Sequence, residues 1–179
     1  MGKAYQEIDA SIARFIQRQK LFFVATAPLA GDGLVNCSPK GLDSLRILDS
    51  KTLVYADVGG SGVETVAHIR ENGRIVLMFC ALEGPRFYGT GTAIEPGDPA
   101  FEALAAPFDT LPTVRNLVRI DVALIRDACG YGVPLYEYRG ERDSLSNWVS
   151  AKTDEELAQY RKDNNRQSLD GLPGLRLES

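Results

Sequence analysis

Two short segments carry side chains that are suited to binding an anion or a polar ligand. The first, NCSPKG at residues 36–41, follows an apolar run and supplies a hydroxyl, a lysine and a glycine within four residues. Ser38 and Lys40 are donors that suit a phosphate or the polar edge of a ring. A plain turn with a solvated lysine explains the same pattern, so both interpretations stay open.

The second segment is the glycine turn GGSG at residues 59–62, which leads into the helical pattern VETVAHIREN. The free amides of a helix's first turn, together with the helix dipole, favour an anion such as phosphate. A capping box between Ser61 at the N-cap and Glu64 at N3 would instead use those amides internally. The turn lacks the GK[ST] of a Walker loop and the GxGxxG of a dinucleotide fold.

Other side chains give weaker signals. Arg86 opens the glycine-rich run RFYGTGTAI, where it is either an edge charge or a donor to a ligand carbonyl. Trp148 is the only tryptophan, and a lone tryptophan is more often a packing anchor than a stacking platform. His68 has no nucleophile motif attached to it, and we identify no catalytic acid, base or nucleophile. One histidine and three dispersed cysteines predict no metal site.

Composition narrows the class of protein. The chain has 179 residues, 44% of them hydrophobic, a net charge of -4 and a pI near 5.1, which favours one soluble domain and argues against nucleic-acid binding. The first residues, MGKAYQEID, carry no apolar leader, and no run is long enough to span a bilayer. We therefore expect a cytoplasmic protein without a membrane partner, in which Cys37, Cys80 and Cys129 are reduced and mostly buried.

Apolar periodicity predicts several short strands interspersed with helices. The expected elements are helices over 4–19, 63–72, 99–108 and after the capping box 153–156, and strands over 21–26, 34–38, 52–57, 74–81, 86–94, 114–126 and 133–139. The strand over 114–126 would present Val118, Ile120, Val122 and Leu124 on one face. Glycines in the 86–94 strand indicate close approach of another backbone or a ligand. The order favours a mainly β (α+β) fold, a small antiparallel barrel with peripheral helices.

Three of these stretches resemble one family in sequence order. NCSPKG, then LVYADVGGSGVETVAHIRENGRIVLMF and RFYGTGTAIEP, are similar to the pyridoxamine 5′-phosphate oxidase-like flavin-binding proteins, over about residues 10–126. The resemblance implies a split β-barrel that binds FMN between the subunits of a homodimer. We expect one such domain over 1–179, with a C-terminal helix and tail from about residue 141. That tail resembles a branch of the family other than the vitamin-forming oxidase itself.

The resemblance also assigns roles to individual residues. Residues 36–40 match the strand that lines the flavin ring and reaches the phosphate, the next strand supplies ring contacts, a turn and helix start bind phosphate, and a polar residue faces the isoalloxazine edge. The predicted cofactor-binding residues are Asn36, Cys37, Ser38, Lys40, Tyr55, Ala56, Ser61, Gly62, Thr65, Arg86 and Trp148.

This sequence departs from the family at the phosphate turn. The basic pair usually found there is replaced by Ser61-Gly62, with Glu64 close by. We therefore predict that Lys40, Ser61, Thr65 and the amides around Gly62 hold the phosphate, while Glu64 folds back as a helix cap.

The leading functional interpretation is an FMN-dependent oxidoreductase acting on a small molecule. Because a flavin supplies the redox chemistry, no side-chain acid or base is required. The alternative is a flavin- or tetrapyrrole-binding protein without turnover. A third interpretation is a split-barrel binding module that has lost its cofactor, which the missing basic pair motivates.

Overall fold

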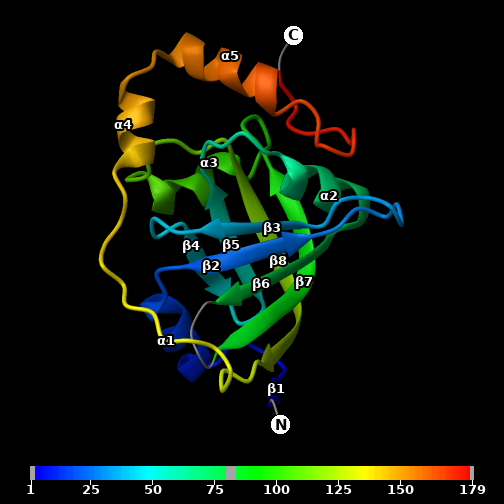
Figure 1. Ribbon diagram of the computed structural model, residues 1–179, viewed down its shortest axis with the longest axis vertical. Helices are drawn as coiled ribbons and strands as arrows, with labels where there is room; N and C mark the ends of the chain where they lie inside the picture. Colours follow the sequence, from blue (N-terminus) through cyan, green and yellow to red (C-terminus); the bar gives the residue numbers. More distant parts are fainter. Residues whose placement is uncertain (1–2, 80–83, 178–179) are drawn as a thin grey trace.

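One curled antiparallel sheet dominates the computed structural model, which describes residues 3–79 and 84–177. The strands run in the spatial order β3-β2-β6-β7-β8-β5-β4, with β1 beside β8. The sheet curves into a half-barrel (Figure 1), which confirms the predicted mainly β split barrel. The strands are β1 (Ala4–Tyr5), β2 (Phe22–Thr26), β3 (Asn36–Lys40), β4 (Leu45–Asp49), β5 (Thr52–Asp57), β6 (Arg74–Phe79), β7 (Pro85–Ile94) and β8 (Asn116–Asp127).

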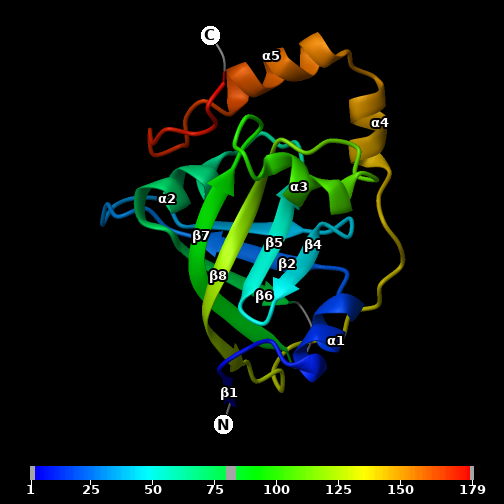
Figure 2. The same cartoon turned by 180° about the vertical axis from the view of Figure 1, so that it is seen from behind.

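Helices lie around this sheet. α1 sits at the end of the half-barrel near the N-terminus, α2 and α3 lie towards the opposite end, and α4 and α5 form an outer arm (Figures 1 and 2). Their bounds are α1 (Ala10–Arg18), α2 (Glu64–Asn72), α3 (Phe101–Ala105) with the 3₁₀ turn η1 (Ala106–Phe108), α4 (Ser144–Ser150) and α5 (Asp154–Asn164).

The core fills the inside of the half-barrel. Every residue of β5 is buried, because one face of this strand packs into the core of the half-barrel and the other packs against the cluster formed with α3 and Phe108. Ile12 and Ile16 of α1 close one end, and Phe22 and Phe79 pack edge to face with other aromatic rings there. β5 therefore provides a rigid support for whatever its last residue, Asp57, contacts.

A β-bulge in β8 changes which side chains face the core. Tyr88 pairs with Leu124 and Gly89 with Val122, so Ala123 has no partner on β7. The extra residue reverses the alternation, and Leu124 is exposed although the sequence pattern placed it with the buried face. A Cβ on Gly89 would lie 2.4 Å from the carbonyl oxygen of Asp121, which confirms the predicted close backbone approach.

Several predicted boundaries differ from the structure. The helix predicted over 4–19 starts only at Ala10, because Asp9 caps it through the amides of Ser11 and Ile12, while Ala4–Tyr5 pairs with β8. The strand predicted over 133–139 is wrong: this stretch is exposed and pairs with no described strand. Residues 80 and 81 of the predicted 74–81 strand lie outside the described residues. β4 and α4 were not predicted.

The surface also corrects the expectation for the cysteines. Cys37 and Cys129 are free thiols but exposed rather than buried, and Cys80 lies outside the described residues.

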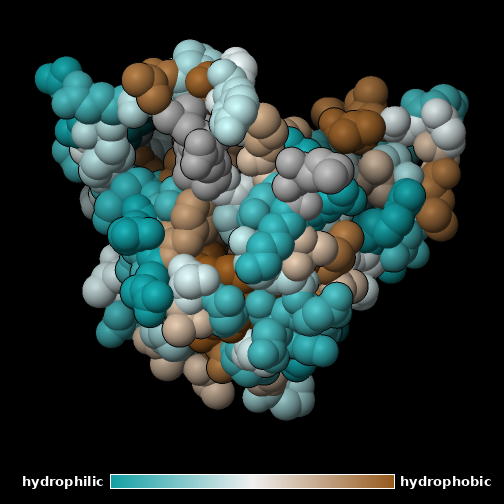
Figure 3. All heavy atoms as spheres, turned by 90° about the horizontal axis from the view of Figure 1, so that it is seen from below, coloured by the Kyte–Doolittle hydropathy of each residue, from teal (hydrophilic) through white to brown (hydrophobic). Residues whose placement is uncertain are grey.

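Seen from below, apolar side chains gather in a central hollow bordered by polar ones (Figure 3). Within residues 3–79 and 84–177, every helix is too short or too polar to cross a bilayer.

Candidate functional site

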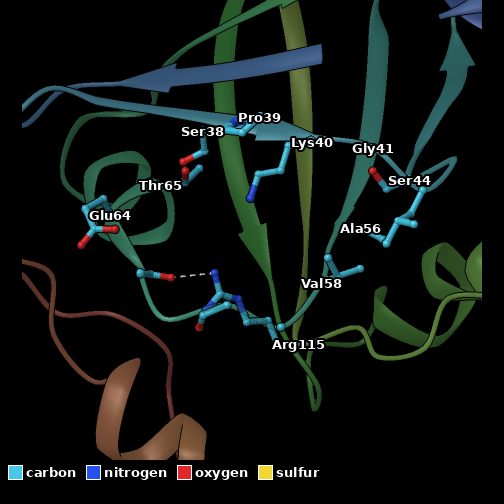
Figure 4. A pocket seen from close by; sticks show the side chains of 14 residues that line it. Ser38, Pro39, Lys40, Gly41, Ser44, Ala56, Val58, Glu64, Thr65 and Arg115 are labelled. Carbon is cyan, nitrogen blue, oxygen red and sulfur yellow. Dashed lines mark hydrogen bonds between the residues drawn. The ribbon is translucent and has the colours of Figure 1, made fainter. Parts of the chain in front are cut away.

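A cavity of about 360 Å³ opens between the end of β3 and the start of α2 (Figure 4). Its walls are residues 38–42 and Ser44, the end of β5 with the following glycine loop, Glu64 and Thr65 at the start of α2, and Arg115 just before β8. The β5–β8 pairing places Asn116 opposite Asp57, so Arg115 and Asp57 meet at one edge of the sheet. The cavity thus collects polar groups from elements that are far apart in sequence.

One wall of the cavity is built on a buried carboxylate held by two cations. Lys40 Nζ lies 2.8 Å from Asp57 Oδ1, and Arg115 Nε lies 3.0 Å from Asp57 Oδ2. Asp57 and Arg115 are buried, whereas Lys40 keeps some exposure and extends into the cavity (Figure 4). Burial alone would raise the pKa of Asp57, but the two cations outweigh it and lower that pKa below its ordinary value. The carboxylate is therefore ionised, and the cluster carries a net charge of about +1.

Arg115 also fixes the shape of the glycine loop. Its guanidinium donates to the carbonyl oxygen of Gly60 at 2.9 Å and to that of Gly62 at 2.7 Å. Asn165, at the end of α5, donates to the Gly60 carbonyl from the other side at 3.0 Å. Because the loop carbonyls are held in this way, the loop has one defined path into α2.

The facing wall rests on hydroxyl and amide groups, and the Glu64 carboxylate at the start of α2 also belongs to the cavity lining. Asn36 Nδ2 donates to Thr65 Oγ1 at 3.0 Å and to Thr26 Oγ1 at 3.1 Å, and Ser38 Oγ donates to Asn36 Oδ1 at 2.8 Å. The Ser38 and Thr65 side chains lie beside each other at the cavity (Figure 4). This wall therefore offers polar atoms whose orientation is fixed by Asn36 behind them.

Tyr55 lies beneath both walls and is fully buried in the half-barrel. Its hydroxyl lies near the Thr65 side chain but makes no hydrogen bond of ordinary length and angle with a described residue, and Lys40 Nζ lies 5.8 Å from the centre of its ring. Burial, aided by the nearby Asp57 charge, raises the pKa of the Tyr55 phenol well above its ordinary value. Tyr55 is therefore a neutral phenol at physiological pH.

The capping box predicted at the start of α2 does not form. The N-cap residue is Val63, which has no capping side chain, and Glu64 is the first residue of the helix rather than the third. Glu64 Oε1 instead accepts from the backbone N–H of Leu169, at 3.4 Å, in the C-terminal segment. The bonds that hold the carbonyls of Gly60 and Gly62 keep the loop extended past Ser61, so the helix begins later than the pattern indicated.

The structure divides the predicted cofactor-binding residues. Those lining the cavity are Ser38, Lys40, Ala56, Gly62 and Thr65.

The other predicted residues lie elsewhere. Asn36 sits behind the wall and Tyr55 below it, while Cys37 and Ser61 are exposed outside the lining. Two predicted residues stand apart from the cavity: Arg86 is exposed on β7 opposite Arg126, and Trp148 packs on Tyr160 in the outer arm at 4.9 Å.

Sequence reasoning missed Arg115. The available signal was a single charge directly before a long apolar strand, and its counterpart, Asp57, ends another such strand. The pairing of β5 with β8 was needed to bring them together.

With this geometry in place, comparison with known proteins identifies the family. Residues 8–129 match the family described as pyridoxamine 5′-phosphate oxidase. The chain belongs to this family. As a member of it, the chain is 33% identical over 192 residues to the pyridoxamine 5′-phosphate oxidase family protein ustO of Aspergillus flavus, covering 96% of this chain and 77% of that protein.

Solved structures of similar proteins share the fold. HupZ of Group A Streptococcus is 29% identical, with a TM-score of 0.54 over 66% of this chain and 91% of that one. A variant of HupZ gives a TM-score of 0.57 at 28% identity, over 68% and 99%. An FMN-binding protein from Syntrophomonas wolfei shares the fold at 18% identity, with a TM-score of 0.50 over 71% and 87%.

Proposed function

We propose that the cavity binds FMN and that the protein is a flavin-dependent oxidoreductase acting on a small molecule. The observation that carries this proposal is the excess positive charge of the Lys40–Asp57–Arg115 cluster beside the Thr65 hydroxyl, in a member of this family. A phosphate group carries about -1.5 to -2 charges at pH 7, so it is attracted to such a cluster.

The donors present suit a phosphate group. Lys40 uses one of its three N–H groups on Asp57, which leaves two for a ligand. Arg115 is committed to Asp57 and the two glycine carbonyls, so its role is to shape the loop. The cavity volume of about 360 Å³ falls in the range of about 300–1,000 Å³ common for small-molecule sites. Lys40 thus supplies the charge that the family's basic pair would provide.

We further propose that the functional unit is a homodimer, which completes the flavin cleft from a second copy. The stretch 131–138 supports this, because Tyr131, Leu135 and Tyr136 are 92%, 85% and 77% exposed. Adjoining exposed apolar side chains of this kind mark association surfaces. Two equivalent sites related by a two-fold axis would follow. Light scattering of the flavin-loaded protein should give twice the chain mass, and a monomer would contradict this proposal.

The bound flavin would supply the electron-transfer chemistry. The chain's own residues would bind and orient it: Lys40 and Thr65 at the phosphate, with Ser38 and Ala56 on the adjoining walls. Tyr55, a buried neutral phenol behind the lining, would add no charge to the site.

The decisive experiment is an absorption spectrum of the purified protein, followed by titration with FMN and riboflavin. We expect a yellow protein that binds FMN more tightly than riboflavin and is bleached by a reduced nicotinamide. A coloured protein that no reductant bleaches would instead support a flavin- or tetrapyrrole-binding protein without turnover. A colourless protein that binds neither flavin would exclude the proposed function.

A further inference from the structure

A buried histidine links the C-terminal segment to the hydrogen bonds behind the cavity. His68 is the only histidine of the chain and is fully buried in α2. Its Nδ1 lies 3.0 Å from Thr26 Oγ1, and its Nε2 lies 3.4 Å from Asp170 Oδ2. Thr26 in turn accepts from Asn36, whose amide also bonds the cavity hydroxyls. One continuous chain of hydrogen bonds therefore runs from the tail to the cavity wall.

The direction of every bond in this chain follows from the carboxylate at its end. A carboxylate only accepts hydrogen bonds, so an imidazole that carries a single ring proton holds it on Nε2, facing Asp170. Nδ1 is then an acceptor, and the Thr26 hydroxyl must donate to it. Thr26 Oγ1 accordingly accepts from the NH₂ group of Asn36, which fixes the orientation of that amide.

The same direction determines what the cavity presents to a ligand. The second N–H of the Asn36 amide goes to Thr65 Oγ1, so the Thr65 hydroxyl keeps its own hydrogen for a ligand acceptor or for the neighbouring Tyr55 hydroxyl. The Ser38 hydroxyl gives its only hydrogen to Asn36 Oδ1 and presents lone pairs. Two hydroxyls of the same chemical type thus have opposite roles at the cavity wall.

We propose that His68 is a positioning residue whose tautomer, selected by Asp170, makes Thr65 a donor and Ser38 an acceptor towards the ligand. The matching ligand class is a phosphate ester whose oxygens approach Thr65, which rests on the proposed function. His68 acts on the cavity hydroxyls through Thr26 and Asn36, and neither His68 nor Asp170 lines the cavity.

Asp170→Asn should reverse the direction of these hydrogen bonds without changing the shape of the side chain at position 170. The backbone N–H of Leu34 donates to Asp170 Oδ1 at 3.0 Å, so the oxygen of the new amide stays on Leu34 and its NH₂ faces His68 Nε2. The imidazole proton then moves to Nδ1, the Thr26 hydroxyl donates to Asn36, and the amide of Asn36 turns over. The Thr65 hydroxyl would then donate its hydrogen to Asn36 and could only accept hydrogen bonds from the ligand.

Nitrogen-15 NMR of the imidazole reads the tautomer without ambiguity, because the chain has one histidine. We expect the proton on Nε2 in the wild type and on Nδ1 in Asp170→Asn. FMN affinity should fall by about 10- to 100-fold in this variant, as for loss of a hydrogen bond to a charged group, while riboflavin affinity stays the same. Asp32→Asn, an exposed carboxylate in the same loop as Leu34, is the charge-matched control and should change neither reading.

Thr26→Val removes the hydroxyl that joins His68 to Asn36. It is a second, independent variant, in case Asp170→Asn disturbs folding. It should leave the proton on Nε2 yet lower the preference for FMN over riboflavin, since the Asn36 amide is no longer oriented. A wild-type proton on Nδ1, or a reversed tautomer in Asp170→Asn with an unchanged FMN preference, would overturn the proposal. If the wild type binds neither flavin, the proposed function fails, while the two tautomer readings still decide whether Asp170 sets the direction.

Discussion

The two walls of the cavity hold buried polar groups in different ways. The Asp57 wall uses full charges, with two cations on one carboxylate, and so provides attraction that acts over distance. The Asn36 wall uses neutral groups, each with a defined donor or acceptor role, and so provides orientation. Changes on the charged wall should therefore affect stability and total affinity, whereas changes on the neutral wall should affect discrimination between ligands.

The largest expected effect comes from Asp57→Asn. Removing the carboxylate leaves the buried Arg115 guanidinium without its counter-charge, so we expect a loss of about 3–5 kcal/mol in the free energy of unfolding. Urea unfolding followed by circular dichroism measures this loss. Asp109→Asn, an exposed aspartate, serves as the control and should stay within about 0.5 kcal/mol of the wild type. A similar small change in Asp57→Asn would mean that the charged wall adds little to stability.

Lys40→Ala tests the attraction itself. We expect FMN affinity to fall by about 10- to 100-fold and riboflavin affinity to fall less, because riboflavin lacks the phosphate that Lys40 would contact. Fluorescence titration with both flavins measures the difference, and the exposed Lys51→Ala is the matched control. Equal losses for the two flavins would assign Lys40 to the ring or to the fold.

Acid should weaken the charged wall selectively. The pKa of Asp57 is lower in the folded protein than its ordinary value of 3.8, so its contribution is complete above that value and is lost as the pH falls through the folded pKa. Between pH 5 and the folded pKa of Asp57, the wild type should lose more unfolding free energy than Asp57→Asn does. Urea midpoints at pH 5 and pH 3 for both proteins give this comparison, and parallel losses would contradict it.

The smallest effect is expected at Ser61, which is exposed on the glycine loop outside the cavity lining. Since Ser61 caps no helix, Ser61→Ala should change the free energy of unfolding by less than about 0.5 kcal/mol. Thr153 does form the predicted capping box with Glu156, and Thr153→Ala should cost about 1 kcal/mol, visible as faster amide exchange in α5. A loss at Ser61 as large as the one at Thr153 would restore the capping interpretation.

The difference between these two caps shows how far sequence reasoning reaches. At Thr153 the cap depends only on residues within one turn, and the local pattern predicts it correctly. At Ser61 the same kind of pattern is overruled by Arg115 and Asn165, which are 53 to 105 residues away from the loop carbonyls they bind. Local motifs therefore predicted the hairpin of β2 and β3 and the end of α2 before Gly73, but not the N-cap of α2.

The missed elements have the same physical cause. β4 is an edge strand without alternation of buried and exposed residues, so its short apolar run gives no period to detect. The strand predicted over 133–139 has suitable residues but no described partner strand, and strand propensity without a partner does not make a strand. Arg115 enters the site only through the register of β5 against β8, which no local pattern contains.

The bond from Asn165 to the Gly60 carbonyl also concerns the order in which the chain is made. It joins residues 105 positions apart, and the contact from Asp170 to His68 spans 102. At a synthesis rate of about 5–20 residues per second, roughly 5–20 s separate the emergence of the glycine loop from that of its anchor. The barrel strands can pair during this interval, but the glycine loop at the cavity acquires its last anchor only when the C-terminal segment docks. A ribosome-bound nascent chain would thus pass through a stage with a folded sheet and an unfinished binding site.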